Sequence, residues 1–198
     1  MTVVPTLGER VARKGNRFTR WICSLVLRLF GWKMKGQLPN APKFIAVVAP
    51  HTTGWDFAIG MLCIQAMGIR LWWMGADWLV KIPFVKSLGG ISIDRSQSHG
   101  VVGQTIQQFL DNEQMVMVIA PEGSRKKKRW KSGFHHIAKG AGVPLVLVGI
   151  TYEGKYVDLS PPLEAGETVE ETFDRIRPFF AQFADEYPDR FVLPTVSE

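Results

Sequence analysis

The sequence contains only two cysteines, Cys23 and Cys63, among 198 residues. Two cysteines cannot build a disulfide framework or a zinc site with four cysteine ligands, and so low a number is typical of a reducing compartment. The chain also lacks internal repeats, low-complexity tracts and long linkers. Because 46% of its residues are hydrophobic and 21% are charged, the composition excludes a disordered chain and favours one domain with a sizeable core.

The sequence also lacks an apolar run long enough to cross a membrane. The nearest candidate is residues 17–32, in which three arginines leave only seven uninterrupted apolar or small residues, where about 20 are needed. No small-residue cleavage site follows this segment, so it does not match a secretory signal either.

Residues 17–32 instead favour a helix that lies in the plane of the lipid headgroups. Trp21, Leu25 and Leu29 share roughly one helical face with Arg28, and aromatic residues flanked by arginines suit such a location. A helix simply packed on the domain is the alternative. We therefore expect residues 1–36 to form a basic, amphipathic membrane-interface segment and residues 37–198 to form the main domain.

Acidic residues are in the minority, with 18 Asp and Glu against 24 Lys and Arg, which gives a formal net charge of +6. Eight of the basic residues lie within residues 1–36 and seven within residues 120–140, whereas residues 153–198 hold eleven acids and four bases. The excess favours anionic partners such as nucleic acid, phospholipid headgroups or phosphorylated metabolites. A solvated basic face is the plainer interpretation of each cluster.

Apolar runs and periodic segments alternate along the chain. Short apolar runs predict five strands, at residues 44–50, 71–75, 91–95, 115–120 and 143–151. Helical patterns follow at residues 56–68, 77–88, 101–112, 133–140 and 168–186. This alternation predicts an α/β fold with a mostly parallel central sheet and helices on both faces, preceded by an N-terminal amphipathic helix.

Polar residues follow three of the predicted strands directly. His51 comes after the first strand, Arg95 ends the third, and residues 122–125 follow the fourth. Because ligand sites of parallel α/β sheets form outside the carboxyl ends of the strands, we expect these residues to share one site.

His51 and Asp56 are five positions apart, so in a regular helix their side chains would point about 140° apart. They can meet only if His51 lies in the turn before the helix and Asp56 in its first turn. Thr53 is a suitable N-cap and Gly54 supplies a flexible backbone there. A carboxylate on one imidazole nitrogen leaves the other free to accept a proton. The alternative is a capping box of Thr53 and Asp56, with His51 uninvolved.

Two glycine-containing segments end in arginine. They are GGISIDR at residues 89–95 and EGSR at residues 122–125. Small residues let backbone N–H groups approach an anion, and arginines bind phosphate in a bidentate manner. The sequence has no Gly-x-Ser-x-Gly, Walker or Gly-x-Gly-x-x-Gly motif, which disfavours a hydrolase, a nucleoside-triphosphatase and a dinucleotide-binding enzyme.

Taken in order, four motifs resemble the glycerophospholipid acyltransferase family of the lysophosphatidic-acid-acyltransferase type. They are HTTGWD (residues 51–56), GGISIDR (89–95), PEGSR (121–125) and the apolar VPLVLV (143–148). The resemblance extends from about residue 44 to residue 151 and makes residues 37–198 an acyltransferase domain. It implies acyl-CoA or acyl carrier protein as co-substrate, with no bound cofactor and no metal.

The resemblance also implies roles for individual residues. His51 would be the general base that takes a proton from a glycerol hydroxyl, and Asp56 would orient it, with no covalent enzyme intermediate. The acceptor's phosphate would be held by Arg95, Gly123 and Arg125, in a loop ordered by Glu122 and Ser124. Val143 and Pro144 would help line the acyl side.

Other interpretations of the basic and histidine residues stay open. His99, His135 and His136 could suggest a metal, although adjacent histidines point in different directions and no further ligand has suitable spacing. Residues 125–131 could bind nucleic acid, in a non-catalytic basic protein, or anionic lipid beside the active site. We expect an enzyme peripheral to the membrane on its cytoplasmic side, acting on a lysophospholipid-type acceptor.

Overall fold

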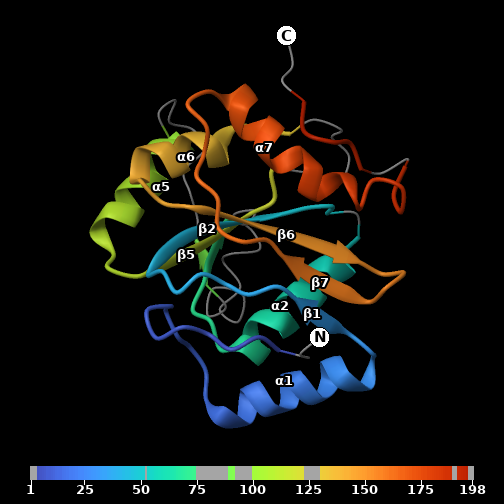
Figure 1. Cartoon of the computed structure of the whole chain (residues 1–198). Coiled ribbons are helices and arrows are strands. Elements are labelled where there is room, and N and C mark those ends of the chain that lie inside the picture. Colours follow the sequence, from blue (N-terminus) through green and yellow to red (C-terminus); the bar gives the residue numbers. More distant parts are fainter. Residues whose placement is uncertain are drawn as a thin grey trace.

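A seven-stranded sheet runs through the centre of the protein (Figure 1). The structure is a computed structural model that describes residues 4–51, 53–74, 89–91, 100–122, 130–188 and 191–195. In the order β1-β7-β6-β2-β5-β3-β4, the strands are β1 (Lys33–Lys35), β7 (Tyr156–Leu159), β6 (Leu145–Thr151), β2 (Lys43–Val48), β5 (Met115–Ile119), β3 (Trp72–Met74) and β4 (Gly90–Ile91). Neighbours are parallel except β6 and β7, which confirms the mostly parallel sheet.

Helices cover both faces of this sheet, as the alternating pattern predicts (Figure 1). One face carries α1 (Arg17–Leu29) and α2 (Trp55–Met67), and the other carries α5 (Gly100–Asp111), α6 (Gly133–Ala141) and α7 (Val169–Ala181). Strand β2 shows why two cores form. Phe44 packs with the α2 side and Ile45 with the α6 and α7 side, because successive side chains of a strand point to opposite faces.

The predicted strands at residues 44–50, 71–75, 115–120 and 143–151 correspond to β2, β3, β5 and β6. Of the strand predicted at residues 91–95, only Ile91 lies within the described residues, and the helix predicted at residues 77–88 lies outside them. The last helix is shorter than predicted, because α7 ends at Ala181 and turns follow. Its predicted start is confirmed, since the Thr168 side chain accepts a hydrogen bond from the backbone N–H of Glu171.

The N-terminal segment packs against the rest of the domain. Strand β1 joins the sheet by pairing with β7, and α1 packs against α2. Before α1 in the chain, Arg13 forms an isolated antiparallel β-bridge with Ile69 through the backbone. Val11 is buried in the same core as residues of α2. Strand β1 thus forms one edge of the sheet, and α1 packs on α2 at one face of it. The boundary after residue 36 stays a prediction.

The helices of the described residues have at most 13 residues. Within that part of the chain, no helix is long and apolar enough to cross a membrane.

Candidate active site

The first site residue lies in the short connection between β2 and α2. Strand β2 ends at Val48, His51 follows three residues later, and α2 begins at Trp55. The N-cap is Gly54, whose backbone adopts a helical conformation, and no side chain caps the helix there. The helix thus begins one residue later than a Thr53 cap would place it, with Asp56 in its first turn as predicted.

His51 and Asp56 face each other across this turn. The Nδ1 atom of His51 lies 3.4 Å from Oδ2 of Asp56. The imidazole is partly exposed, whereas Asp56 is only 3% exposed. Because the carboxylate faces Nδ1, Nε2 is the ring nitrogen left to accept a proton. The turn therefore has the arrangement of a general base with an orienting carboxylate.

Asp56 also makes part of the capping contact that was the alternative to a catalytic pair. Its Oδ2 accepts a 2.7 Å hydrogen bond from the backbone N–H of Thr53, and its Oδ1 lies 3.1 Å from the Thr53 hydroxyl. The two interpretations are compatible, because these contacts hold the carboxylate in place without displacing His51.

A tyrosine outside the predicted site completes the surroundings of Asp56. The hydroxyl of Tyr152 donates a 2.6 Å hydrogen bond to Oδ1 of Asp56. Burial alone would raise the pKa of Asp56, but its bonds with His51, Tyr152 and Thr53 together hold that pKa below its ordinary value. The carboxylate is therefore ionised at neutral pH, as an orienting group must be.

The sequence carries one signal that could have identified Tyr152. It directly follows β6, which runs parallel to β2, so its position obeys the same strand-end rule that selected His51. Apart from that position, a single tyrosine has no motif to identify it.

Glu122 lies behind His51. It follows β5, is buried, and its Oε1 accepts a 3.0 Å hydrogen bond from the backbone N–H of His51. Burial raises the pKa of Glu122, and the nearby charge of Asp56 adds to that rise. The other residues predicted for the phosphate site, Arg95, Gly123, Ser124 and Arg125, lie outside the described residues.

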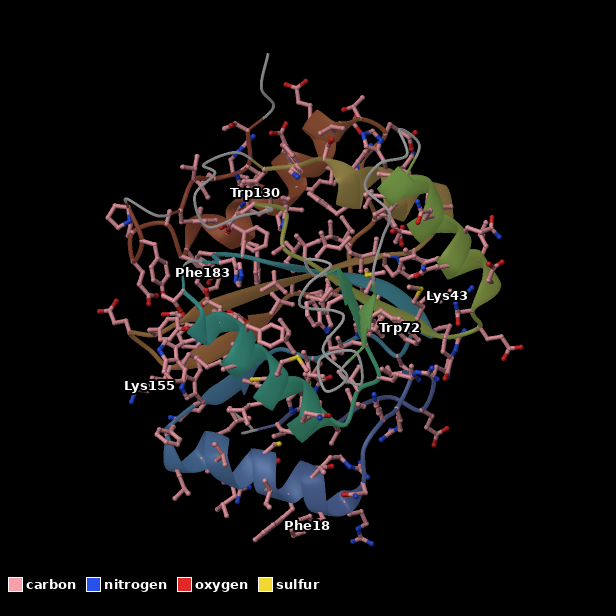
Figure 2. All side chains as sticks on the ribbon, turned by 180° about the vertical axis from the view of Figure 1, so that it is seen from behind. Phe18, Lys43, Trp72, Trp130, Lys155 and Phe183 are labelled. Atoms are coloured by element: carbon pink, nitrogen blue, oxygen red, sulfur yellow. The ribbon has the colours of Figure 1, made fainter. Side chains whose placement is uncertain are left out.

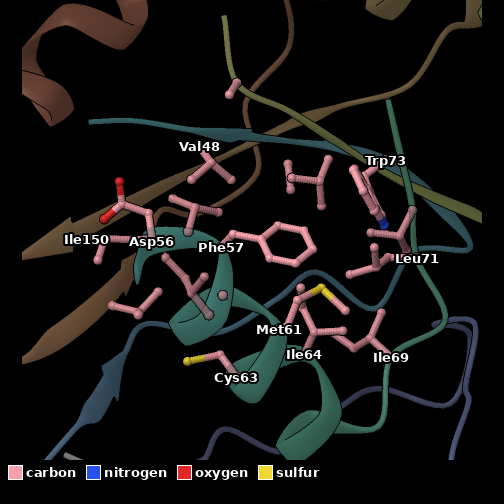
Figure 3. Close-up of a pocket in the computed structure, with 18 of the residues that line it drawn as sticks. Val48, Asp56, Phe57, Met61, Cys63, Ile64, Ile69, Leu71, Trp73 and Ile150 are labelled. Atoms are coloured by element: carbon pink, nitrogen blue, oxygen red, sulfur yellow. The ribbon is translucent and has the colours of Figure 1, made fainter. Parts of the chain in front are cut away.

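An apolar cavity of about 400 Å³ opens from the His51–Asp56 pair (Figure 3). It runs between α2 and the sheet, with Asp56 near one end and Ile69 and Leu71 at the other (Figure 3). The α2 residues that line it include Phe57, Gly60, Met61, Cys63, Ile64 and Met67. Its shape and lining suit an extended hydrocarbon chain whose polar end lies beside His51.

Val143 and Pro144 do not line this cavity. They precede β6 at the amino edge of the sheet, where the Pro144 carbonyl accepts a hydrogen bond from the N–H of Ile45. His51 follows the carboxyl end of β2, which is parallel to β6, so the sheet separates the two positions by the length of a strand. They therefore do not take part in this cavity, and their place on the acyl side stays a prediction.

Of the three histidines considered for a metal, His99 lies outside the described residues. Buried His135 bonds through Nδ1 to the Thr172 hydroxyl at 2.8 Å, and its ring lies edge-on to that of His136. Within the described ranges, no three His, Cys, Asp or Glu residues come together in a way that could hold a metal ion.

The ordered motifs and this geometry agree with a family comparison. Residues 33–151, more than half of the chain, match the model of the family described as Acyltransferase. The chain belongs to the acyltransferase family. The matched region of this acyltransferase-family chain begins at β1 and ends with β6, and so includes His51, Asp56 and Glu122.

Two curated relatives bear the name 1-acyl-sn-glycerol-3-phosphate acyltransferase. The protein from Escherichia coli (strain K12) is 25% identical over 170 residues, and that from Salmonella typhimurium (strain LT2) is 26% identical over the same length. In both cases the alignment covers 79% of this chain and 66% of the relative. The chain therefore spans slightly less than two thirds of the relatives' length.

A solved structure shares the fold. It is the crystal structure of the 1-acyl-sn-glycerophosphate (LPA) acyltransferase from Thermotoga maritima, with a TM-score of 0.61 and 14% sequence identity. The superposition covers 89% of this chain and 80% of that one.

Proposed function

We propose that the chain is an O-acyltransferase that moves a fatty acyl group from an acyl thioester to a hydroxyl of a lysophospholipid-type acceptor. The observation that carries this proposal is the His51–Asp56 pair at the end of an apolar cavity. A proton acceptor beside a space for a hydrocarbon chain is what alcohol acylation by a fatty thioester requires. The names of the curated relatives agree with this reaction.

In the proposed mechanism, Nε2 of His51 removes the proton of the acceptor hydroxyl as its oxygen attacks the thioester carbonyl carbon. The new C–O bond forms, the tetrahedral intermediate collapses, and the C–S bond breaks. The protonated His51 then returns the proton to the leaving thiolate, so that no covalent enzyme intermediate is needed. Asp56 holds the imidazole through Nδ1 and stabilises its charged form; general-base assistance of this kind contributes about 10²–10⁴-fold to a rate.

The acyl chain is proposed to occupy the cavity between α2 and the sheet. The sheet contributes valines and alanine to its wall, and α2 contributes Phe57, Met61 and Ile64. Burying the chain there releases about 0.8 kcal/mol for each methylene group removed from water. This free energy favours long-chain donors, carried by coenzyme A or acyl carrier protein.

The acceptor's phosphate is proposed to bind Arg95, Gly123 and Arg125, beside the pair. Support comes from the residues on either side of the segment that holds Gly123 and Arg125. Glu122 accepts a hydrogen bond from the backbone N–H of His51. The N–H of Lys131 donates a 2.8 Å hydrogen bond to the Pro121 carbonyl. Both flanks of residues 123–129 thus lie at the carboxyl edge of the sheet, where the acceptor's hydroxyl must meet His51.

A peripheral location on the cytoplasmic side of an anionic membrane is proposed from the exposed face of α1. Leu27 is buried and Cys23 is half-buried in the core shared with α2, whereas five large apolar side chains of α1 are exposed: Phe18, Trp21, Ile22, Leu25 and Leu29. Trp21 is 60% exposed and Leu29 is 75% exposed, and Phe18 projects away from the body of the protein (Figure 2). An outward apolar face with three arginines on the same helix suits the headgroup region of a bilayer.

The test is acyl transfer by the purified full chain, with long-chain acyl-CoA and acyl carrier protein as donors and a panel of lysophospholipids as acceptors. Nucleic-acid binding is measured beside it. The proposal predicts turnover with a phosphorylated lysophospholipid, and loss of turnover at high salt if the phosphate contacts dominate. If no donor and acceptor pair reacts, while nucleic acid binds with steep salt dependence, the chain is a non-catalytic basic protein instead.

A further inference from the structure

Tyr152 lies where the sheet and the helix carrying Asp56 come together. It follows β6 directly, and its hydroxyl reaches 2.6 Å from Oδ1 of Asp56, 96 positions earlier in the chain. The same hydroxyl is 3.1 Å from the Thr53 hydroxyl. Tyr152 therefore links the end of β6 to the turn that holds His51.

Tyr152 is itself fixed at both ends. Its backbone N–H donates a 2.7 Å hydrogen bond to Glu186, which also accepts hydrogen bonds from the N–H of Glu153 and the hydroxyl of Tyr187. Its ring packs edge-to-face against Trp32, with 5.4 Å between the ring centres. A side chain held at its backbone and across its ring presents the hydroxyl in one place.

The two oxygens of the Asp56 carboxylate have separate partners. Oδ1 receives the Tyr152 hydroxyl and lies beside that of Thr53, whereas Oδ2 receives the Thr53 N–H and faces His51 Nδ1. A carboxylate held through both oxygens cannot rotate about its Cβ–Cγ bond. We propose that Tyr152 is a positioning residue that holds Asp56 so that Oδ2 stays directed at His51. This inference rests on the proposed acyltransferase activity.

The hydroxyl keeps the proton that this role requires. Burial and the hydrogen bond to Asp56 raise the pKa of Tyr152 to about 12, so its hydroxyl remains a donor at neutral pH. A hydrogen bond from a neutral donor to a charged acceptor is among the stronger ones in proteins.

The experiment compares steady-state kinetics of wild type, Tyr152→Phe and Tyr187→Phe, with thermal unfolding of each. Tyr187→Phe is the matched control, because the Tyr187 hydroxyl donates to Glu186 and lies 3.3 Å from the backbone N–H of Tyr152 but has no hydrogen bond with Asp56. Glu186 still accepts that N–H at 2.7 Å in this variant. We expect kcat of Tyr152→Phe to fall about 10-fold or more, with KM for both substrates within about twofold of wild type. Tyr187→Phe should retain the wild-type kcat.

A third variant separates positioning from packing. Replacing Tyr152 by 4-aminophenylalanine keeps an N–H donor at the same place, and it should restore most of the kcat lost in Tyr152→Phe. Wild-type kcat in Tyr152→Phe would overturn the inference, as would an equal loss in Tyr187→Phe. If Tyr152→Phe does not fold, a folded but inactive 4-aminophenylalanine variant overturns it. A wild-type chain inactive with every substrate would overturn the proposed function, and this inference with it.

Discussion

The backbone N–H of His51 donates a 3.0 Å hydrogen bond to the buried carboxylate of Glu122, which lies 71 positions further along the chain. The bond joins the residues that follow two neighbouring parallel strands, β2 and β5. His51 is thus held from two directions, by Glu122 at its backbone and by Asp56 at its ring. The two carboxyl groups differ in how readily they ionise, because the pKa of Glu122 is raised while that of Asp56 is lowered.

The raised pKa of Glu122 predicts that replacing it with glutamine stabilises the fold at neutral pH. When the pKa of a carboxyl group is higher in the folded state than in the unfolded state, the fold becomes less stable as the pH rises. The loss begins at the unfolded pKa, about 4.3, and continues up to the folded pKa. Glutamine carries no charge there and can still accept the N–H of His51. Glu122→Gln should therefore melt about 2 °C or more above wild type at pH 8.

The gain of Glu122→Gln should disappear near pH 3, about one pH unit below the unfolded pKa, where wild-type Glu122 is protonated in both states. Glu113→Gln is the control for the loss of one carboxylate, because Glu113 is exposed, and its melting temperature at pH 8 should stay near that of wild type. Thermal unfolding at several pH values gives the answer. A Glu122→Gln protein that is less stable than wild type at pH 8 would show that the carboxylate has a charged partner that outweighs its burial.

The position of Gly60 allows a test of how the cavity limits the length of the acyl chain. It lies on α2 and lines the cavity, and a Cβ atom added there meets nothing within 4 Å. Gly60→Leu would therefore place a side chain in the cavity rather than against a neighbour. We expect the longest donor used efficiently to become shorter by several carbons, while kcat with short donors is kept and the helix is stabilised by up to about 1 kcal/mol.

Gly103→Leu is the control for the chain-length measurement. Gly103 also lies within a helix, α5, with open space at its Cβ, but it is exposed and does not line the cavity. The readout is kcat/KM for a series of acyl-CoA donors of increasing length. An unchanged length profile in Gly60→Leu would mean that the acyl chain binds elsewhere.

The exposed face of α1 predicts binding to anionic vesicles. In the double variant Trp21→Glu and Leu29→Glu, flotation with phosphatidylserine-containing vesicles should weaken at least about tenfold, because both apolar side chains are lost and two negative charges are added. The melting temperature should stay near that of wild type, since both positions are exposed. Leu110→Glu is the control, because this residue on α5 is 59% exposed and α5 covers the opposite face of the sheet.

Wild type that stays in the soluble fraction at every salt concentration would contradict the membrane proposal. Equal losses in the α1 variant and in Leu110→Glu would contradict the assignment of binding to α1.

The sequence predicted the parts of the fold that have strong local patterns. The apolar runs of β2, β5 and β6 and the amphipathic α5 were found because each buries a continuous face. Strands β1 and β7 were missed. They have three and four residues and carry charged or polar side chains, so only their pairing at the sheet edge makes them strands.

In the site too, contacts that are local in the sequence could be predicted and contacts between distant segments could not. The spacing of His51 and Asp56 was enough to predict that they meet, because one turn before a helix N-terminus is local geometry. The contacts of Tyr152 with Asp56 and of Glu122 with the His51 backbone depend on which strands are neighbours, and that is set by the whole sheet. The places of Val143 and Pro144 could not be predicted in this way, because a motif gives their order in the chain and not which edge of the sheet they occupy.

The most direct test of the account is acyl transfer by His51→Ala and Asp56→Asn. Asp56→Asn should unfold below the wild-type temperature, because the lowered pKa of Asp56 means that its ionised form stabilises the fold at neutral pH. The variants are therefore compared at a temperature at which each is folded. His51→Ala should lose about 10²–10⁴-fold in kcat, because the proposed general base, Nε2, is removed. Asp56→Asn should lose less, since the imidazole remains but its orienting charge is gone. Turnover of a phosphorylated lysophospholipid at the wild-type rate by folded His51→Ala would contradict the account.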